Sequence, residues 1–375
     1  MHSLSLNNPK EADFFWRQLG KFRNVENTTK LLIKQHNIPN NQKNNAKKQA
    51  AQIGYCIKLA KEYFTASRHV SIATKAVLQY YGIMNLAIAE FLFKQDGKSS
   101  LDRAREKHSH HGLEFSFDQS SLKQLSFKGL ATGLKSKPYI HSNERRGTFN
   151  LWNKTSKGYP CVGKIREISS SFQVTKNNIL AAETSFFKPV NQAGLNLYEV
   201  FMSLPFLNST FAHFDHKKNY VRGMMEQEIN ELSNSNKFTL VIHPDLQLDE
   251  LLKQFLISPS EVPHVSIKKE KDGALINYTT QIGFPVGNLR FPSSIQYDTD
   301  ELFWYVKDHQ LNEFGYIYIG LYMLGNFARY YPDHWVRTVE EVSDLAIVCE
   351  HFMENLEMRA TLLIYSELSS CLCLH

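Results

Sequence analysis

Apolar side chains recur every three to four positions along the first 94 residues, which is the spacing of one helix face. The pattern predicts a helix within residues 9–36, a second over 46–66 and a third, longer one over 72–94. The polar segment NIPNNQKNN at 37–45 separates the first two, and the Asp-Gly pair at 96–97 supplies a stop after the third. The N-terminal quarter of the chain is therefore predicted to be helical.

The same spacing returns towards the C-terminus. An apolar stripe predicts a helix over 314–331 that Pro332 ends, and a second stripe predicts a last helix over 339–367. Neither stripe can be buried by its own helix, so we expect the helices of both chain ends to pack as one bundle. The specific expectation is contact between the helices at 72–94 and 314–331.

The helical period is lost between about residues 98 and 190, where short mixed segments predict irregular structure and short strands. LNLYEVFMSLPFL at 195–207 predicts a short helix stopped by Pro205, and residues 237–244 and 264–282 predict strands, the latter folded at a KDG turn. The predicted fold class is α+β. A helical bundle from the N- and C-terminal helices, 1–97 and 310–375, carries a mixed α/β central insert, 98–309.

Composition adds a cellular setting. Hydrophobic residues make up 42% of the chain and charged residues 21%, as in a soluble globular protein, and the five scattered cysteines contain no CxxC. The segment MHSLSLNNPKEADFF has no secretory signal pattern, and every apolar stretch is interrupted before the roughly 20 residues that a membrane span needs. We expect a cytoplasmic protein without a membrane partner.

The net charge of +6 is distributed unevenly. Residues 1–70 hold twelve Lys or Arg against four Asp or Glu, and residues 300–375 hold four against twelve. One interpretation is a basic nucleic-acid-binding face at the N-terminal end. The other is that the two terminal regions dock on each other through complementary charge.

Three segments carry a resemblance. They are AVLQYYGIMNLAIAEFLF at 76–93 followed by HHGL, LNLYEVFMSLPFL in the middle, and YIGLYMLGNFARYYPDHW at 318–335. In order and spacing they resemble the YaaC-like family of bacterial proteins over most of the chain. That resemblance implies a family and no particular activity.

A more distant resemblance is to HEPN helical domains, through Tyr80, Tyr81, Ala87, Leu92, His111 and Gly112. Many HEPN domains are ribonucleases of toxin or antiviral systems, with an Arg and a nearby His doubled by dimerisation. Arg103-x4-His108, Arg105-x4-His110 and Arg329-x4-His334 have that spacing. Histidine can move the 2′-hydroxyl proton of RNA, and arginine can hold the phosphate. The candidate catalytic residues are Arg103, His108, His111, Arg329 and His334.

Each candidate has an ordinary structural alternative. Arg329 can cap its helix, where cations are favoured, and the histidines can form a polar turn. The histidines at 108, 110 and 111 and the HFDH segment at 213–216 lack HExxH spacing and a cysteine partner, so we expect no metal. No P-loop, GxGxxG or GxSxG motif occurs, so no cofactor is expected.

Basic groups in the middle of the chain are candidates for nucleic-acid binding: Arg145, Arg146, Lys217, Lys218, Arg222, Lys268 and Lys269. Tyr139, Trp152, Tyr159 and Tyr220 lie near two of these groups in the sequence, which suits base stacking. The alternative is that these charges form solvated faces.

Three functions stay open on the sequence. The first is a nucleic-acid-associated protein, which the HEPN resemblance places in bacterial antiviral defence, with RNA, DNA or a defence protein as partner and a homodimer as its assembly. The second is a metal-independent ribonuclease that uses an Arg/His pair. The third is a non-catalytic interaction or scaffold component.

Overall fold

The computed structural model describes most of the chain, and every structural statement below concerns the described residues. These are 2–5, 12–95, 110–123, 126–156, 161–168, 173–180, 190–213, 216, 218–244, 248–252, 265–271, 273–282, 294–296, 301–306, 311–340 and 343–374.

The N-terminal region is helical, as predicted. It contains α1 (Ala12–Gly20), α2 (Val25–His36), α3 (Lys43–Ser67) and α4 (Ile72–Phe93), with 3₁₀ turns η1 (Lys21–Arg23) and η2 (Asn40–Gln42). The single helix expected within 9–36 is divided at Asn24, whose side chain accepts a hydrogen bond from the Asn27 amide at 3.0 Å and so caps α2. Asn37, with φ of 50°, ends α2 in the left-handed conformation.

The C-terminal region forms α10 (Glu313–Tyr330), α11 (Pro332–Glu340) and α12 (Asp344–Ser369). Pro332 does follow the end of α10, but it also begins α11, because proline is well tolerated in the first turn of a helix. The last helix was predicted to start at residue 339, which is wrong: Ser343 caps α12 by accepting from the Ala346 amide at 3.1 Å.

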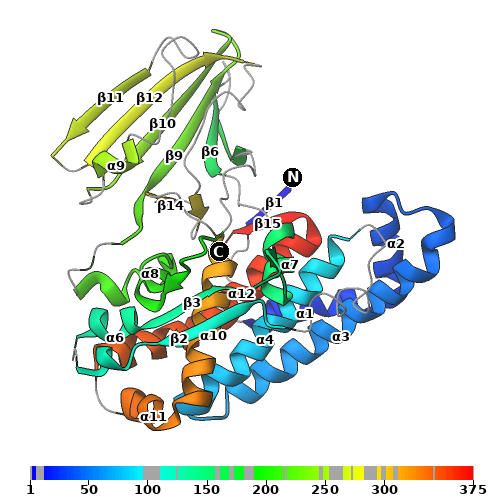
Figure 1. The fold of residues 1–375 in the computed structure, drawn as a ribbon. Helices are drawn as coiled ribbons and strands as arrows, with labels where there is room; N and C mark the ends of the chain where they lie inside the picture. The colour runs from blue at the N-terminus through cyan, green and yellow to red at the C-terminus, as the bar shows by residue number, and fades with distance from the viewer. Residues whose placement is uncertain are drawn as a thin grey trace.

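The two chain ends pack together, and the expected contact between α4 and α10 is confirmed. The rings of Tyr80 and Tyr318 meet edge to face at 5.9 Å, and a Cβ built on Gly325 would lie 3.4 Å from the Cβ of Tyr80. The Trp335 indole on α11 donates to the Ala73 carbonyl at 2.7 Å. Figure 1 shows the blue N-terminal helices beside the orange and red C-terminal ones.

Much of the central region belongs to the core of this bundle. Its elements are β2 (Leu113–Phe117), η3 (Gln119–Lys123), α6 (Phe127–Gly133), β3 (Leu134–Pro138), β4 (Ile140–His141), β5 (Glu144–Arg145), α7 (Thr148–Thr155), β8 (Leu195–Asn196), α8 (Leu197–Phe201), η5 (Pro205–Leu207) and η6 (Thr210–His213). Phe149 and Trp152 of α7 and Phe201 of α8 are buried in the same apolar cluster as α4 and α10. α7 occupies a segment where short strands were expected.

A second apolar core is formed by a mixed β-sheet. Its strands are β6 (Cys161–Ile168), β7 (Gln173–Leu180), β9 (Tyr220–Asn230), β10 (Ser235–Ile242), β11 (Val265–Glu270), β12 (Gly273–Gln281), β13 (Ser294–Gln296) and β14 (Leu302–Tyr305), with α9 (Leu248–Leu252) packed against them. The order is β11-β12-β10-β9-β14-β13, and β6 pairs with β7 and runs parallel to β9. Figure 1 shows the sheet standing away from the bundle. The predicted strands at 237–244 and 264–282 are confirmed.

The two ends of the described chain also meet, since β1 (His2–Ser5) pairs in parallel with β15 (Cys371–Leu374). Complementary charge contributes to the docking of the terminal regions. Arg68 pairs with Glu357 at 2.7 Å, and Lys94 pairs with Glu367 at 2.7 Å. Among the basic residues of 1–70, Arg68 follows the docking interpretation of the charge asymmetry, whereas Lys94 lies outside that range.

One described helix, α4, is long and apolar enough to cross a membrane. Most of its apolar window is buried inside the protein, because α3, α10 and α12 pack around it. Its composition is therefore explained by its place in the core.

Candidate functional site

The Tyr-Tyr pair of α4 and the His-Gly segment meet in space. The Tyr80 hydroxyl and His111 Nδ1 are joined by a hydrogen bond of 2.8 Å, and the two rings pack edge to face at 5.5 Å. Tyr322 of α10 lies against both rings, at 5.6 Å from Tyr80 and 6.1 Å from His111. The Tyr322 hydroxyl donates to the Leu113 carbonyl at 2.7 Å, which holds β2 beside α10.

The backbone around His111 is fixed by the first turn of α7. The amides of Thr148 and Phe149 donate to the carbonyls of His110 and His111 at 2.9 and 3.0 Å, which satisfies two free N–H groups of that helix. Gly112 has φ of +88°, and a Cβ there would lie 2.9 Å from the Phe149 amide nitrogen. Glycine is needed here for both its conformation and its small size.

Arg329, near the end of α10, contacts the second tyrosine of the Tyr-Tyr pair. Its guanidinium donates to the Tyr81 hydroxyl and to the Tyr330 hydroxyl, each at 3.3 Å, and lies 5.1 Å from the centre of the Tyr330 ring. Tyr81 stacks on Tyr63 of α3 at 5.6 Å. We call the set the tyrosine–histidine cluster: Tyr63, Tyr80, Tyr81, His111, Tyr322, Arg329 and Tyr330.

The cluster changes the acid–base behaviour of its members. Partial burial lowers the pKa of His111, and the nearby charges of Arg329 and His110 lower it further, so the imidazole is neutral at pH 7. Burial raises the pKa of Tyr80 well above its usual value, with Tyr318 adding to the effect. A neutral imidazole thus lies within the electrostatic influence of a permanent cation.

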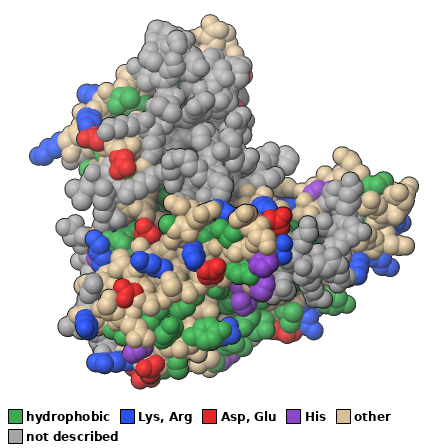
Figure 2. Space-filling model, viewed as in Figure 1, with side chains coloured by type: hydrophobic (Ala, Val, Ile, Leu, Met, Phe, Trp, Pro, Cys, Tyr) green, Lys and Arg blue, Asp and Glu red, His purple; other side chains and the backbone are tan. Residues whose placement is uncertain are grey.

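The exposed part of the cluster is aromatic and basic. Tyr330 is 62% exposed. On the β4–β5 side, the His110 ring lies 4.8 Å from Tyr139, which stacks on His141 at 6.5 Å. Figure 2 shows histidine side chains gathered on the bundle beside hydrophobic and basic ones.

The predicted catalytic residues do not form one group in the structure. The charge of Arg329 acts on His111 and lowers its pKa, and the two residues contact the adjacent tyrosines Tyr81 and Tyr80. His334 lies on α11, 3.6 Å from Asp333 and with its ring 6.1 Å from Phe117, whereas the contacts of Arg329 go to Tyr81 and Tyr330. Arg103 and His108 lie outside the described residues.

The predicted basic set is spread over separate parts of the molecule. Arg145 donates to the Val190 carbonyl at 2.7 Å, and the Arg146 amide donates to Tyr139, so both lie near the cluster. Lys218 donates to Asn208 beneath the sheet. On the sheet, Arg222 pairs with Glu301, Lys268 with Glu270 and Lys269 with Asp249, while Lys217 lies outside the described residues.

Within the described part of the chain, no group of three or more His, Cys, Asp or Glu side chains is placed to hold a metal ion. The side chains of the cluster itself offer hydrogen bonding, ring stacking and proton transfer at His111.

The family model described as "YaaC-like Protein" matches residues 21–144 and 163–368. The chain belongs to the YaaC-like family. The match includes α4, the His-Gly segment, α8, α10 and most of α12, so every member of the cluster lies within the YaaC-like region. No curated protein and no solved structure matches this YaaC-like chain.

Sequence reasoning missed Tyr330 in this YaaC-like site, and it named His111 and Arg329 as candidates without deciding whether they belong to one cluster. Tyr330 was treated only as part of a family segment, because an exposed tyrosine at a helix end has no pattern of its own. His111 and Arg329 are 218 positions apart in the numbering, and the packing of α4 against α10 brings them into one cluster.

Proposed function

We propose that this YaaC-like protein binds single-stranded nucleic acid, with RNA as the favoured form, at the tyrosine–histidine cluster. The observation that carries the proposal is the exposed Tyr330 ring with the Arg329 guanidinium 5.1 Å from its centre. Bases stack on exposed aromatic rings in a largely sequence-independent way, and arginine adds both phosphate binding and cation–π contact. The resemblance to HEPN domains supports a setting in bacterial antiviral defence.

The surroundings of Tyr330 favour the same function. The Tyr63–Tyr81 pair, the His110–Tyr139 pair and the cations Arg329 and Arg146 supply stacking surfaces and positive charge on one side of the bundle. Arg146 pairs with Glu144 at 3.5 Å and Arg222 on the sheet pairs with Glu301 at 3.1 Å, which makes both of them weaker phosphate ligands. Among the described residues, no carboxylate pairs with Arg329.

The test is the affinity of the purified protein for a fluorescent single-stranded RNA, measured by anisotropy over a range of salt concentrations. Wild type is expected to bind with a steep salt dependence. Tyr330→Ala removes a base-stacking ring and is expected to weaken binding about 5-fold or more, and Arg329→Gln to weaken it and flatten the salt dependence.

Matched controls locate the site. Tyr55 on α3 is 67% exposed, close to the exposure of Tyr330, so Tyr55→Ala removes an equivalent ring elsewhere and should leave affinity unchanged. Arg222→Gln tests whether RNA binds to the sheet. If Arg222→Gln loses RNA binding and Arg329→Gln does not, the binding site is on the sheet. If the wild-type protein does not bind RNA, the scaffold function is favoured.

A second candidate, a metal-independent ribonuclease, is favoured by the lowered pKa of His111 beside Arg329. When Nδ1–H donates to the Tyr80 hydroxyl oxygen, Nε2 keeps its lone pair and can accept the 2′-hydroxyl proton. Arg329 would then hold the phosphate as negative charge develops on it.

Cleavage assays with a metal chelator separate this candidate from simple binding. His111→Asn is expected to abolish cleavage while RNA affinity remains, and His334→Asn is the control because His334 contacts Asp333 and Phe117 instead. His108→Ala tests whether His108, which lies outside the described residues, is needed for cleavage. If the wild-type protein cleaves neither structured nor single-stranded RNA, the ribonuclease function is wrong.

A further inference from the structure

A recess lies between α1 and the C-terminal half of α3. It has a volume of about 570 Å³ and is lined by α1, η1 and the C-terminal half of α3. Its lining residues are Trp16, Arg17, Gly20, Arg23, Ile57, Lys58, Lys61, Glu62, Thr65, Ala66 and His69. None of them belongs to the tyrosine–histidine cluster. Its volume is within the roughly 300–1,000 Å³ of sites that hold small molecules.

The recess holds an excess of positive charge. Four of its lining side chains are Lys or Arg, and its single carboxylate, Glu62, lies 3.7 Å from Lys58. Among the described residues, no carboxylate pairs with Arg17, Arg23 or Lys61. Other cations of this region do have partners, as Arg68 has in Asp13 and Glu357. Like charges gathered around a hollow focus a positive potential into it and favour an anionic ligand.

We propose that this recess binds a small molecule that carries two or more phosphate groups, of the size of a nucleoside diphosphate. The two guanidinium groups can each bind a phosphate through two parallel hydrogen bonds, and the Lys61 ammonium adds a point charge. Trp16, Ile57 and Ala66 give the wall an apolar part that suits the uncharged portion of such a ligand. A volume of about 570 Å³ matches the size of a mononucleotide.

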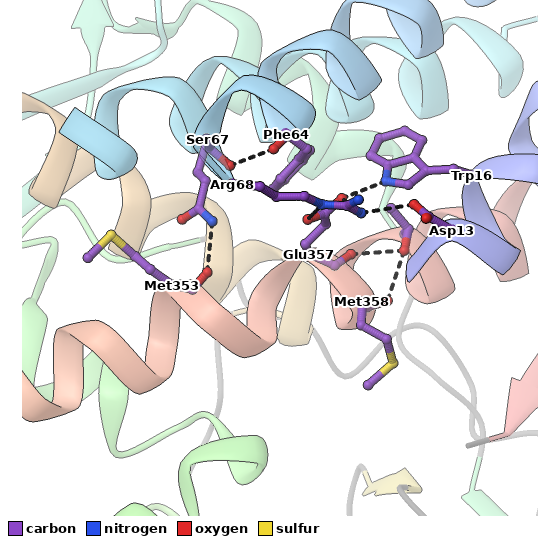
Figure 3. A network of polar contacts seen from close by, with 10 residues as sticks. Asp13, Trp16, Phe64, Ser67, Arg68, Met353, Glu357 and Met358 are labelled. Carbon is purple, nitrogen blue, oxygen red and sulfur yellow. Dashed lines mark hydrogen bonds and ion pairs between the residues drawn. The ribbon is translucent and has the colours of Figure 1, made fainter. Parts of the chain in front are cut away.

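The recess is connected to the contact between the two chain ends. The Trp16 indole lines it and donates to Glu357 of α12 at 2.7 Å. Glu357 in turn receives two hydrogen bonds from Arg68, at 2.7 and 3.0 Å, and Figure 3 shows the indole and the guanidinium meeting at this carboxylate. A ligand bound only by the folded bundle also raises its stability by mass action.

Isothermal titration of the full chain with ADP, inorganic pyrophosphate and adenosine tests the proposal. ADP and pyrophosphate are expected to bind, and adenosine to bind at least about 10-fold more weakly than ADP because it offers no charge to the cations. The combined variant Arg17→Ser, Arg23→Ser and Lys61→Ser is expected to lose about 10-fold or more in ADP affinity. These side chains are exposed, so the variant should fold, which circular dichroism checks.

A charge-matched control is the combined variant Lys34→Ser, Lys43→Ser and Lys47→Ser, whose lysines are exposed and do not line the recess. It should keep ADP affinity within about 2-fold of wild type, since screened charges at this distance contribute little. Failure of ADP and pyrophosphate to bind wild type at millimolar concentration overturns the proposal, as does an equal loss in the control.

The two sites are separable by experiment. Tyr330→Ala should keep ADP binding, and the recess variant should keep RNA binding. If the recess variant loses RNA binding and keeps ADP binding, the recess is part of an RNA surface and the small-molecule proposal is wrong.

Discussion

Arg68 and Glu357 are 289 positions apart in the chain, and the Arg68 guanidinium binds both oxygens of the Glu357 carboxylate. Trp16 donates to the same carboxylate, so α1, α3 and α12 are joined at one acidic side chain (Figure 3). Glu357 is only 10% exposed, and a carboxylate this well buried is stable as a charge only with such partners.

Glu357→Gln should therefore destabilise the fold. The amide oxygen can still accept from Trp16, but Arg68 loses its ion pair with Glu357 and keeps only the more exposed one with Asp13. We expect the free energy of unfolding in urea to fall by about 1–2 kcal/mol. The control is Glu62→Gln, which breaks the exposed pair with Lys58 and should cost less than about 0.5 kcal/mol. Equal losses in the two variants would contradict a special role for Glu357.

Gly82 allows α3 to approach α4. A Cβ at this position would lie 2.7 Å from a ring carbon of Phe64, which is buried. Gly82→Ala should destabilise the protein by about 1–3 kcal/mol in chemical unfolding, because overpacking outweighs the better helix propensity of alanine.

Gly20→Ala is the matched control for Gly82→Ala. Gly20 has helical φ and ψ, and nothing lies within 4 Å of a Cβ built there. We expect a gain of up to about 1 kcal/mol from the reduced backbone entropy of the unfolded chain. Destabilisation by Gly20→Ala would show that backbone effects, and not the Phe64 contact, dominate at Gly82.

Acidification should weaken the fold through His111. Its pKa is lowered in the folded state by burial, Arg329 and His110, so the unfolded chain takes up a proton first as the pH falls. The stability that His111 contributes is therefore complete above its unfolded pKa of about 6.5 and decreases as the pH falls through that value towards the lower folded one.

The measurement is the free energy of unfolding between pH 8 and pH 5 in wild type and His111→Asn. Asparagine does not titrate in this range, so the difference between the two proteins should shrink as the pH falls. A difference that is constant across this range would contradict the lowered pKa. Tyr80 and Tyr322, which also contact His111, stay protonated throughout.

Cysteine reactivity should follow burial. Cys349 is fully buried and burial raises its pKa well above the usual range, while the pKa of Cys373 is raised to about 11 by burial. Neither forms much thiolate at pH 8, so both should react slowly with a thiol reagent in the native protein. Cys371 is less buried and should be labelled before them, as mass spectrometry of timed samples would show. Rapid native labelling of Cys349 would contradict its place in the core.

Local sequence signals determined most helices of this protein. Periodic apolar residues located α3, α4 and α10 to within a few positions, since a long amphipathic or buried helix repeats its signal over several turns. The division of 9–36 at Asn24 and of the last helix at Ser343 was missed, although both residues are ordinary N-caps. An N-cap is indicated by a single residue, whereas the apolar stripes on either side of it span several turns and favour one continuous helix.

The middle of the chain was harder to predict. β10, β11 and β12 have β-branched or alternating sequences and were found, whereas β9, with YVRGMMEQEIN, has no such pattern and takes its conformation from its neighbours β10, β14 and β6. α7 was missed because eight residues give too short a stretch for a helical period.

The sequence by itself determined the helical ends, the α+β class, the family and the pairing of α4 with α10, because apolar stripes of that length must be buried against each other. Only the tertiary structure decided which functional groups meet. The cluster of His111 with Arg329 and the recess of Arg17, Arg23 and Lys61 each join residues from separate elements. Their chemistry depends on distance and burial, and neither quantity is encoded in the spacing of residues along the chain.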